Sequence, residues 1–508
     1  MILDRIAVLM RRAKDGSGKD LRLTGAPRVH LLAVGLMAAG ALVMLLTGCA
    51  IGPNYVKPAS PVPDAYKEMD GWKVAQPGDN AVRGPWWEIF GDDELNALEG
   101  QVNISNQNVL MMEAQFRQAR SLIQAAQAAY FPTITAGAAF VRAQRSANTS
   151  QGSGTTGGLS SDYLLPVNVS WELDLWGRIR RTSEAAKASA QASAADLEAV
   201  RLSTQAELAL AYFQLRILDT QRQLLDATTA AYERSLELTK NQYENGVVSR
   251  ADVLQAETQF KTTRAQAIDV GVQRAQLEHA VALLIGKPAS SFSIPVKTPV
   301  MAPPDIPVGL PSELLERRPD IAAAERRVAA ANARVGIALT AFFPKVTLGA
   351  MAGYESSSSG DWLTWPSRLW AVGPTITETI FDGGLRSALT DEARAAYDAA
   401  VASYRQIVLT GFKEVEDNVS ALRILEEEYR AQDEAVDAAR KSLEFSLNQY
   451  KHGVASYLNV VVAQAAALSN EKVAVGIMGR RMAASVLLIK ALGGGWESGS
   501  IGNSSSSR

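Results

Sequence analysis

The sequence predicts an α+β membrane protein in which one unit, two strands and a long helical hairpin, occurs twice. Motifs from the first half of the chain return in the second half. Short segments alternate apolar and polar residues, as half-buried strands do. Long proline-free stretches suit helices that are longer than the diameter of a compact domain. Whatever is inferred for one half should therefore hold, with quasi-symmetry, for the other.

The duplication is visible as identical residues at fixed offsets. Asn241-Gln242-Tyr243 returns as Asn448-Gln449-Tyr450, an offset of 207 residues (448 − 241). Phe131-Pro132 returns as Phe343-Pro344, an offset of 212 residues (343 − 131). Such a unit is too long for a solenoid repeat of about 20 to 50 residues, so the sequence indicates duplication of a whole structural half.

The first 48 residues are predicted to be a secretory signal. Basic residues precede an apolar run from Leu31 to Leu46, which is too short to span a bilayer comfortably. A short transmembrane anchor is the disfavoured alternative. Leu46-Thr47-Gly48-Cys49 follows and resembles the lipobox of bacterial lipoproteins, which implies acylation of the Cys49 sulfur and of its freed amine. Ala50, in place of the Asp that retains such lipoproteins at the inner membrane, implies the outer membrane.

Composition argues against several other classes of protein. Cys49 is the single cysteine, so the chain has neither an intrachain disulfide nor a thiolate metal site. A formal net charge of −2 without a basic block is unlike a nucleic-acid-binding protein. The three histidines lie far apart, and no phosphate-binding glycine motif follows a strand. We therefore expect no enzyme activity, no metal and no cofactor beyond the covalent lipid on Cys49.

Two long helical hairpins are predicted, one in each half. The stretch from Glu184 to Asn245 is proline-free and alanine-rich, with large apolar residues at heptad-like spacing. A helix of roughly 60 residues reaches about 90 Å, which is too extended for a globular bundle. Gly246 ends this helix, and a second runs from about Ala251 to Leu284. The arrangement recurs from about Arg386, through the turn at Gly453, to Leu492.

Four alternating segments predict membrane strands. They are Ile134 to Phe140, Tyr163 to Leu175, Val346 to Ala352 and the less regular Val372 to Phe381. Each is near the length that a tilted membrane strand needs. Tryptophans lie near the strand ends, where interfacial aromatic residues collect: Trp171, Trp176, Trp365 and Trp370. One strand alone would suit a soluble hairpin equally well, but four in matched pairs in a lipid-anchored chain favour a membrane barrel.

Four strands from one chain cannot close such a barrel. An open sheet would leave backbone groups unpaired in hydrocarbon, so the barrel must be shared between copies of the chain. Two copies give eight strands, which enclose little more than side chains, whereas three copies give twelve. Three copies are the better prediction for a protein that passes solute.

Composition also divides the chain into segments. We expect a lipoprotein signal peptide (1–48), an acylated extended segment (49–90), a first structural repeat (91–290), a Pro-rich linker (291–312), a second structural repeat (313–497) and a disordered tail (498–508). Each repeat contains two strands and one helical hairpin.

Four stretches carry a resemblance to a known family: Trp86 to Leu95, Trp171 to Arg178, Gly309 to Ile321 and Phe381 to Gly384. The four stretches occur in this order in a chain whose two halves repeat. With them, the chain resembles the outer-membrane factor (TolC-like) family over about Gly52 to Gly493. Within that family it is similar to the lipoprotein branch of efflux-pump outer-membrane subunits (NodT/OprM-like). The resemblance implies a homotrimer in which a twelve-stranded β-barrel continues into a twelve-helix periplasmic α-barrel.

The resemblance also implies a function and partners. We expect an outer-membrane exit duct of a tripartite efflux pump, lipid-anchored and extending into the periplasm. It would passively conduct drugs or other small molecules from an inner-membrane efflux transporter, through a periplasmic adaptor (membrane fusion) protein, to the exterior. Two alternatives stay open: a duct for type I protein secretion, and a structural envelope lipoprotein, although a structural tether needs no lipid-facing strands.

The glycine turns match the periplasmic tip that meets the adaptor's helical hairpins in that family. The matching residues are Gly246, Val247, Ser249, Gly453, Val454 and Ser456. Glycine permits close approach of a partner backbone, and the neighbouring valine can pack against that partner. The alternative is simple capping, because a left-handed glycine commonly ends a helix.

A periplasmic gate is expected just after the second turn. In the family the helix there carries inward acidic side chains, but the matching Asn459 and Val462 are uncharged in this chain. Leu458 matches a hydrophobic constriction residue. Three copies of Leu458 near the axis would close the pore by dewetting, without a carboxylate ring. The alternative is that Leu458 is an ordinary residue of the helix seam.

Overall fold

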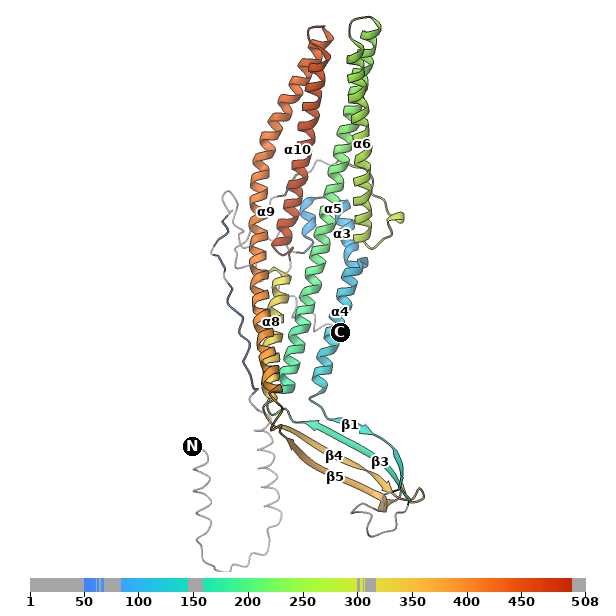
Figure 1. Ribbon diagram of the computed structural model, residues 1–508, viewed down its shortest axis with the longest axis vertical. Helices are drawn as coiled ribbons and strands as arrows, with labels where there is room; N and C mark the ends of the chain where they lie inside the picture. Colours follow the sequence, from blue (N-terminus) through green and yellow to red (C-terminus); the bar gives the residue numbers. More distant parts are fainter. Residues whose placement is uncertain are drawn as a thin grey trace, which may run out of the picture.

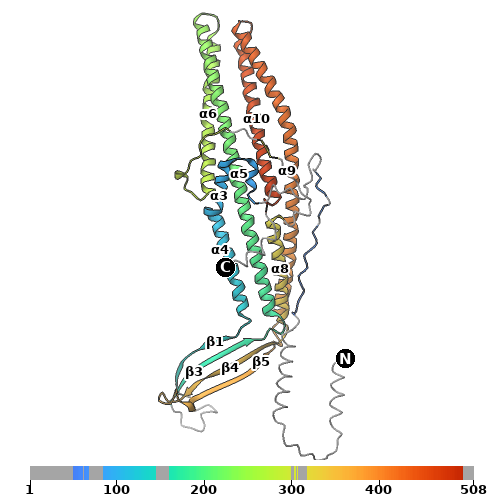
Figure 2. The ribbon, with the colours of Figure 1, turned by 180° about the vertical axis from the view of Figure 1, so that it is seen from behind.

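The computed structural model describes residues 50–60, 62–63, 65–67, 84–144, 159–298, 302–304, 306 and 317–495. Figure 1 shows long helices side by side along one axis, with the sheet at one end. The turns that join α5 to α6 and α9 to α10 lie at the opposite end, and the view from behind in Figure 2 agrees. The signal, Cys49 and the tail predicted over 498–508 lie outside the described residues, as does part of the predicted linker.

The helices confirm the duplication through their lengths. The first half contains α3 (Asp93–Ser105), α4 (Gln107–Ala128), α5 (Arg178–Glu244) and α6 (Arg250–Leu284), and the second contains α8 (Pro319–Thr340), α9 (Leu385–Lys451) and α10 (Tyr457–Ala491). Helices α5 and α9 have 67 residues each, α6 and α10 have 35 each, and α4 and α8 have 22 each. In the part of the chain that the structure describes, none of these helices is both long and apolar enough to cross a bilayer.

One antiparallel sheet contains all the described strands. These are β1 (Thr133–Ala136), β2 (Ala139–Gln144), β3 (Leu159–Glu172), β4 (Lys345–Ser356) and β5 (Arg368–Thr377). The order is β1-β3-β4-β5, and β2 pairs with β3 beyond the end of β1. Because β1 and β2 follow each other along the same side of β3, the chain supplies four strand positions, as predicted.

Three predicted strands need correction. The first is not continuous, because β1 and β2 are separated by two residues that lie opposite Leu165 and Pro166 on β3. A proline has no N–H to donate, so the ladder is interrupted there, and only Gly137 N reaches Pro166 O, at 3.1 Å. The second, expected over Tyr163 to Leu175, is β3, which begins earlier and ends at Glu172. The fourth ends at Thr377 rather than at Phe381. Its partner strand begins at Lys345, which pairs with Thr377, so the following residues have no strand to pair with.

The register gives the sheet one apolar and one polar face. Val169 pairs with Ala350, which pairs with Val372, and the next such row contains Val167, Ala352 and Trp370. On the other face, one row contains Ser170, Gly349 and Gly373, and another contains Glu172, Thr347 and Thr375. The alternation that predicted half-buried strands therefore persists across neighbouring strands.

Each strand pair passes into its long helix through a similar turn. Asp174 accepts hydrogen bonds from Ile179 N at 2.8 Å and Arg180 N at 2.9 Å at the start of α5. Asp382 accepts from Gly384 N at 3.0 Å and Arg386 N at 3.2 Å at the start of α9, and the Arg386 guanidinium lowers the pKa of Asp382. Two of the four motifs that carry the resemblance thus fix the junctions between sheet and helices.

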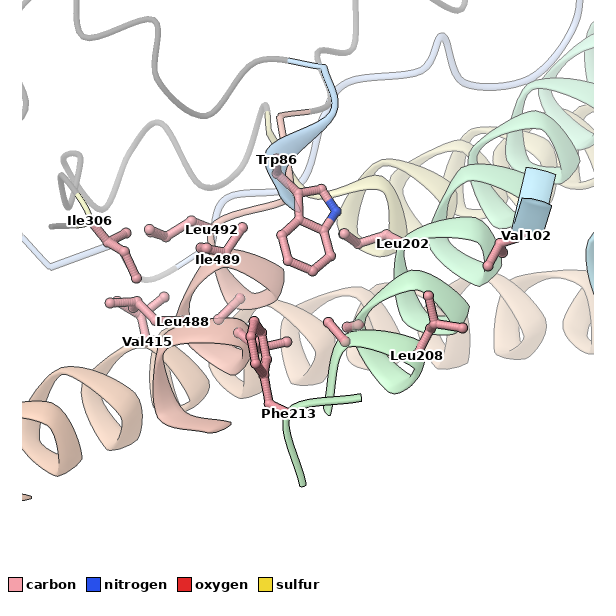
Figure 3. Packing of buried hydrophobic residues seen from close by; sticks show 14 of the residues in the cluster. Trp86, Val102, Leu202, Leu208, Phe213, Ile306, Val415, Leu488, Ile489 and Leu492 are labelled. Carbon is pink, nitrogen blue, oxygen red and sulfur yellow. The ribbon is translucent and has the colours of Figure 1, made fainter. Parts of the chain in front are cut away.

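The largest core lies partway along the helices, where segments far apart in the sequence converge. Figure 3 shows Trp86 and Phe213 close to Leu488 and Ile489 of α10. Trp86 begins the 3₁₀ helix η2 (Trp86–Phe90), and the Phe90 and Phe213 rings are 4.8 Å apart between centroids. A third motif therefore packs into this core.

Buried charge ties the same region together. The fully buried Arg216 donates to Glu94 Oε2 at 2.7 Å, Asp219 Oδ2 at 2.9 Å and Pro295 O at 2.8 Å. Asp219 also accepts from Arg274 Nε of α6 at 2.7 Å. Because each charge of this network has a partner, the network joins α3, α5 and α6 without an isolated ion.

Candidate functional site at the helical tip

The first tip turn is a complete Schellman cap. Gly246 has a φ of +73°, in the left-handed region. Gly246 N donates to Tyr243 O at 2.9 Å, and Val247 N donates to Gln242 O at 2.8 Å. These two bonds satisfy carbonyl groups that the end of α5 would otherwise leave unpaired. The capping interpretation is therefore confirmed for Gly246.

The second turn repeats the first. Gly453 has a φ of +71°. Gly453 N donates to Tyr450 O at 3.0 Å, and Val454 N donates to Gln449 O at 2.9 Å. Both glycines thus end helices by the same geometry, and the docking role assigned to them stays a prediction.

The outside of each turn is open and apolar. A Cβ atom added at either glycine would find no atom within 4 Å, which means that the structure leaves space there. Val247 is 67% exposed and Val454 is 74% exposed. Two exposed valines at the ends of rigid hairpins are features that a docking surface requires.

The helices that leave the two turns begin differently. Ser249 forms a capping box with Asp252: the Ser249 side chain accepts from Asp252 N at 3.3 Å, and Asp252 Oδ2 accepts from Ser249 N at 3.0 Å. Ser456 makes no side-chain capping bond, and Asn459 stands where the first half has Asp252. The capping box gives Ser249 a structural role that Ser456 lacks.

The predicted gate residues lie outside the packed seam. Leu458 is 52% exposed and Val462 is 61% exposed, and Asn459 is also exposed. The positions of α10 that pack into the tip core are Tyr457, Val460 and the partly buried Val461. Leu458 therefore lies outside the packed seam within the described chain, and its role as a gate stays a prediction.

Hydrogen bonds join the two hairpins just behind the tip. Tyr450 Oη of α9 donates to Thr239 Oγ1 of α5 at 3.3 Å, and Gln464 Nε2 of α10 donates to Ser235 Oγ of α5 at 3.4 Å. Sequence reasoning missed these residues. The Asn-Gln-Tyr repeat contains Tyr450, but its counterpart Tyr243 is exposed, so the repeat alone does not reveal a contact between hairpins.

The predicted lipidation site Cys49 lies outside the described residues, but the chain that follows it is held in place. Ile51 N donates to Trp176 O at 3.0 Å, and Arg181 Nε donates to Ile51 O at 3.2 Å. Gly52 packs directly against the backbone of Gly336 on α8. These contacts fix the start of the described chain at the junction between sheet and helices.

Shortening Leu458 tests the gate. We expect Leu458→Ala channels in planar bilayers to conduct several times more current than wild type, because a wider, less apolar constriction stays hydrated. Leu254→Ala, a half-exposed leucine on α6, is the matched control and should conduct like wild type. Unchanged conductance in a correctly assembled Leu458→Ala protein would remove Leu458 as the gate.

A family comparison matches the chain over most of its length. The family described as "Outer membrane efflux protein" matches residues 99–287 and 310–494. These two segments correspond to the two halves of the duplication.

Individual relatives align with this chain over nearly their whole length. The toluene efflux pump outer membrane protein TtgF of Pseudomonas putida is 31% identical over 483 residues, covering 92% of this chain and 98% of TtgF. The outer membrane protein OprJ of Pseudomonas aeruginosa is 31% identical over 466 residues, covering 90% of this chain and 95% of OprJ. The solved structure of the outer-membrane channel OprN has a TM-score of 0.81 and 30% identity, and covers 88% of this chain and 100% of OprN.

Proposed function

Because this chain belongs to the outer membrane efflux protein family, we propose that three copies form a lipid-anchored exit duct through the outer membrane. In this arrangement the three sheets close one twelve-stranded barrel, and the helices continue it as a twelve-helix periplasmic tunnel. The duct conducts small molecules passively, since its task is to enclose a path rather than to supply energy.

The observation that carries this proposal is the amphipathic sheet, whose two edges have no partner strand among the described residues. Strand β5 forms one edge, and β1 with β2 forms the other. In hydrocarbon each unpaired backbone group is costly, so both edges need a partner strand. A ring of identical chains supplies it, because each β5 edge meets the β1 and β2 edge of the next copy.

Partners at the far end follow from the tip. The exposed valines and open glycines face away from the membrane end, which suits capture by helical hairpins of a periplasmic adaptor. The adaptor connects the duct to an inner-membrane efflux transporter. The name of TtgF points to a small apolar solute, so we propose drugs, solvents or similar small molecules as substrates.

The number of chains provides the first test. Purified in detergent, the protein should have three times the mass of its mature protomer by light scattering corrected for detergent, because three sheets supply twelve strands. Inserted in planar bilayers, the same preparation should form channels. A monodisperse monomer would contradict the shared barrel, and a dimer would limit it to eight strands.

The lipid anchor provides a second test. Cys49→Ser should lose all incorporation of labelled palmitate, because the thiol that accepts the acyl chain is absent. The barrel should still insert, so we expect the resistance of cells to fall in part rather than completely. Persistent labelling of Cys49→Ser would show that the lipid is attached elsewhere.

A further inference from the structure

At the end of the sheet that lies farthest from the helices, positive and negative side chains lie on opposite faces of the sheet. On the apolar face, Arg142 of β2 pairs with Ser161, and Arg368 of β5 pairs with Tyr354. The carboxylates of this end, Asp162 and Glu355, occupy the opposite register positions, on the polar face. The two arginines are therefore the charges that this end of the sheet presents on its apolar side.

Arg368 is held in a prepared orientation. Its guanidinium carbon lies 3.7 Å from the centroid of the Trp365 ring. The turn that contains Trp365 is closed by Ser367 Oγ, which donates to Asp361 O at 2.6 Å, and by Thr364 Oγ1, which donates to the same oxygen at 2.7 Å. A stacked guanidinium keeps its N–H groups free at the edge, where they can bind a second group.

Nothing within the described residues neutralises these two cations. Neither Arg142 nor Arg368 forms an ion pair with a carboxylate in the part of the chain that the structure describes. The surroundings are aromatic: Trp365 is 71% exposed, Trp370 lies on the same face as Arg368, and Phe140 packs against Tyr163 with ring centroids 4.7 Å apart. Exposed aromatic residues beside an apolar strand face mark the level of lipid headgroups.

The partner follows from this chemistry. On a lipid-facing strand an arginine is costly at the bilayer midplane and tolerated only near the headgroups. The helices and the start of the described chain lie at the other end of the sheet, so this rim reaches the outer leaflet if the proposed barrel is correct. We propose that Arg368, Trp365, Trp370 and Arg142 form a rim that binds the phosphate groups of phosphorylated glycolipid in the outer leaflet.

Closure of the barrel would complete this site. Arg368 lies on the β5 edge and Arg142 on the β2 edge, so the ring that joins those edges brings the two cations onto neighbouring strands of adjacent copies. A diphosphorylated headgroup then meets two guanidinium groups, each able to form two parallel N–H···O bonds to phosphate.

The test measures lipid selectivity with the full-length protein. Detergent-solubilised protein is titrated with bis-phosphorylated lipid A, with its dephosphorylated form and with phosphatidylcholine, and bound lipid is counted by native mass spectrometry. We expect tight binding of the bis-phosphorylated form alone. Arg142→Gln/Arg368→Gln should weaken it about tenfold or more, since charge-assisted bonds are lost.

Three further variants keep the inference falsifiable. Arg368→Lys retains the charge but loses the planar fork, so its affinity should fall between those of wild type and the double variant. Trp365→Ala should weaken binding although both cations remain. Arg430→Gln, on an exposed part of α9, is the matched control and should bind like wild type.

Two results would overturn the rim. One is equal binding of phosphorylated and dephosphorylated lipid by wild type, and the other is equal affinity of wild type and the double variant. A protein that enters no vesicle of any composition would instead count against the barrel, so failure of the proposed function remains distinguishable from failure of the rim.

Discussion

Replacing both Gly246 and Gly453 with tryptophan is expected to abolish efflux while the protein remains assembled. The Cβ atom added at either position would meet no atom within 4 Å, so the cost expected within the chain is the left-handed backbone, about 1 to 2 kcal/mol per site. Outside the turn, however, two bulky side chains would occupy the space that the proposed adaptor hairpin would need. We expect loss of drug resistance in cells at a normal level of trimer.

The matched control is the double alanine variant. Alanine carries the same backbone strain as tryptophan but adds only a methyl group, so both double variants should lose similar thermal stability. The alanine variant should keep most of its resistance. Normal resistance in the tryptophan variant would reduce both glycines to helix caps, and equal loss in both variants would assign the effect to strain.

Glu99→Gln is expected to stabilise the protein strongly at alkaline pH. Glu99 of α3 is 0% exposed, and neither of its carboxylate oxygens has a hydrogen-bond partner among the described residues. Burial raises the pKa of Glu99 to about 9, from 4.5. The folded state therefore holds a proton that the unfolded state releases.

The sign follows from this difference in bound protons. The raised pKa contributes stability that is fully present below pH 4.5 and is lost progressively as the pH rises towards 9. At about 1.4 kcal/mol per pH unit, wild type loses about 3 kcal/mol by pH 7 and about 6 kcal/mol by pH 9. Glutamine cannot ionise, so Glu99→Gln should lose none of this stability as the pH rises.

Melting temperatures measured from pH 4 to pH 9 check this expectation. The gap between Glu99→Gln and wild type should open steadily with pH. Glu113→Gln, an exposed glutamate of α4, serves as control and should follow wild type. Parallel melting curves for Glu99→Gln and wild type would mean that Glu99 is solvated or paired in the assembled protein.

The sequence predicted the helices well because their signals are local. Proline-free, alanine-rich stretches predicted α5 and α9, and the glycines that end them lie at the left-handed positions of both turns. Strand limits were predicted less well because they depend on partners. Pro166 interrupts a ladder on the neighbouring strand, and Lys345 sets where β5 ends, so neither limit is contained in the segment that it limits.

The candidate site shows the same division between local and distant information. The Gly246 and Gly453 turns follow from residues adjacent in sequence, whereas the bond between Tyr450 and Thr239 joins residues 211 positions apart. Likewise, the sequence alone did not place Arg142 and Arg368 on the same face of the sheet, because that result needs the register of four strands. Contacts between elements depend on packing, which residue periodicity alone does not specify.

The unequal starts of α6 and α10 make the two hairpins differ in local stability. At α6, Ser249 and Asp252 satisfy amide groups of the first turn, and Asp252 complements the positive end of the helix. At α10 neither a side-chain cap nor an acidic residue stabilises the first turn. The amides of Leu458 and Asn459 should therefore exchange hydrogen for deuterium faster than those of Ala251 and Asp252, and fraying should begin at the second hairpin.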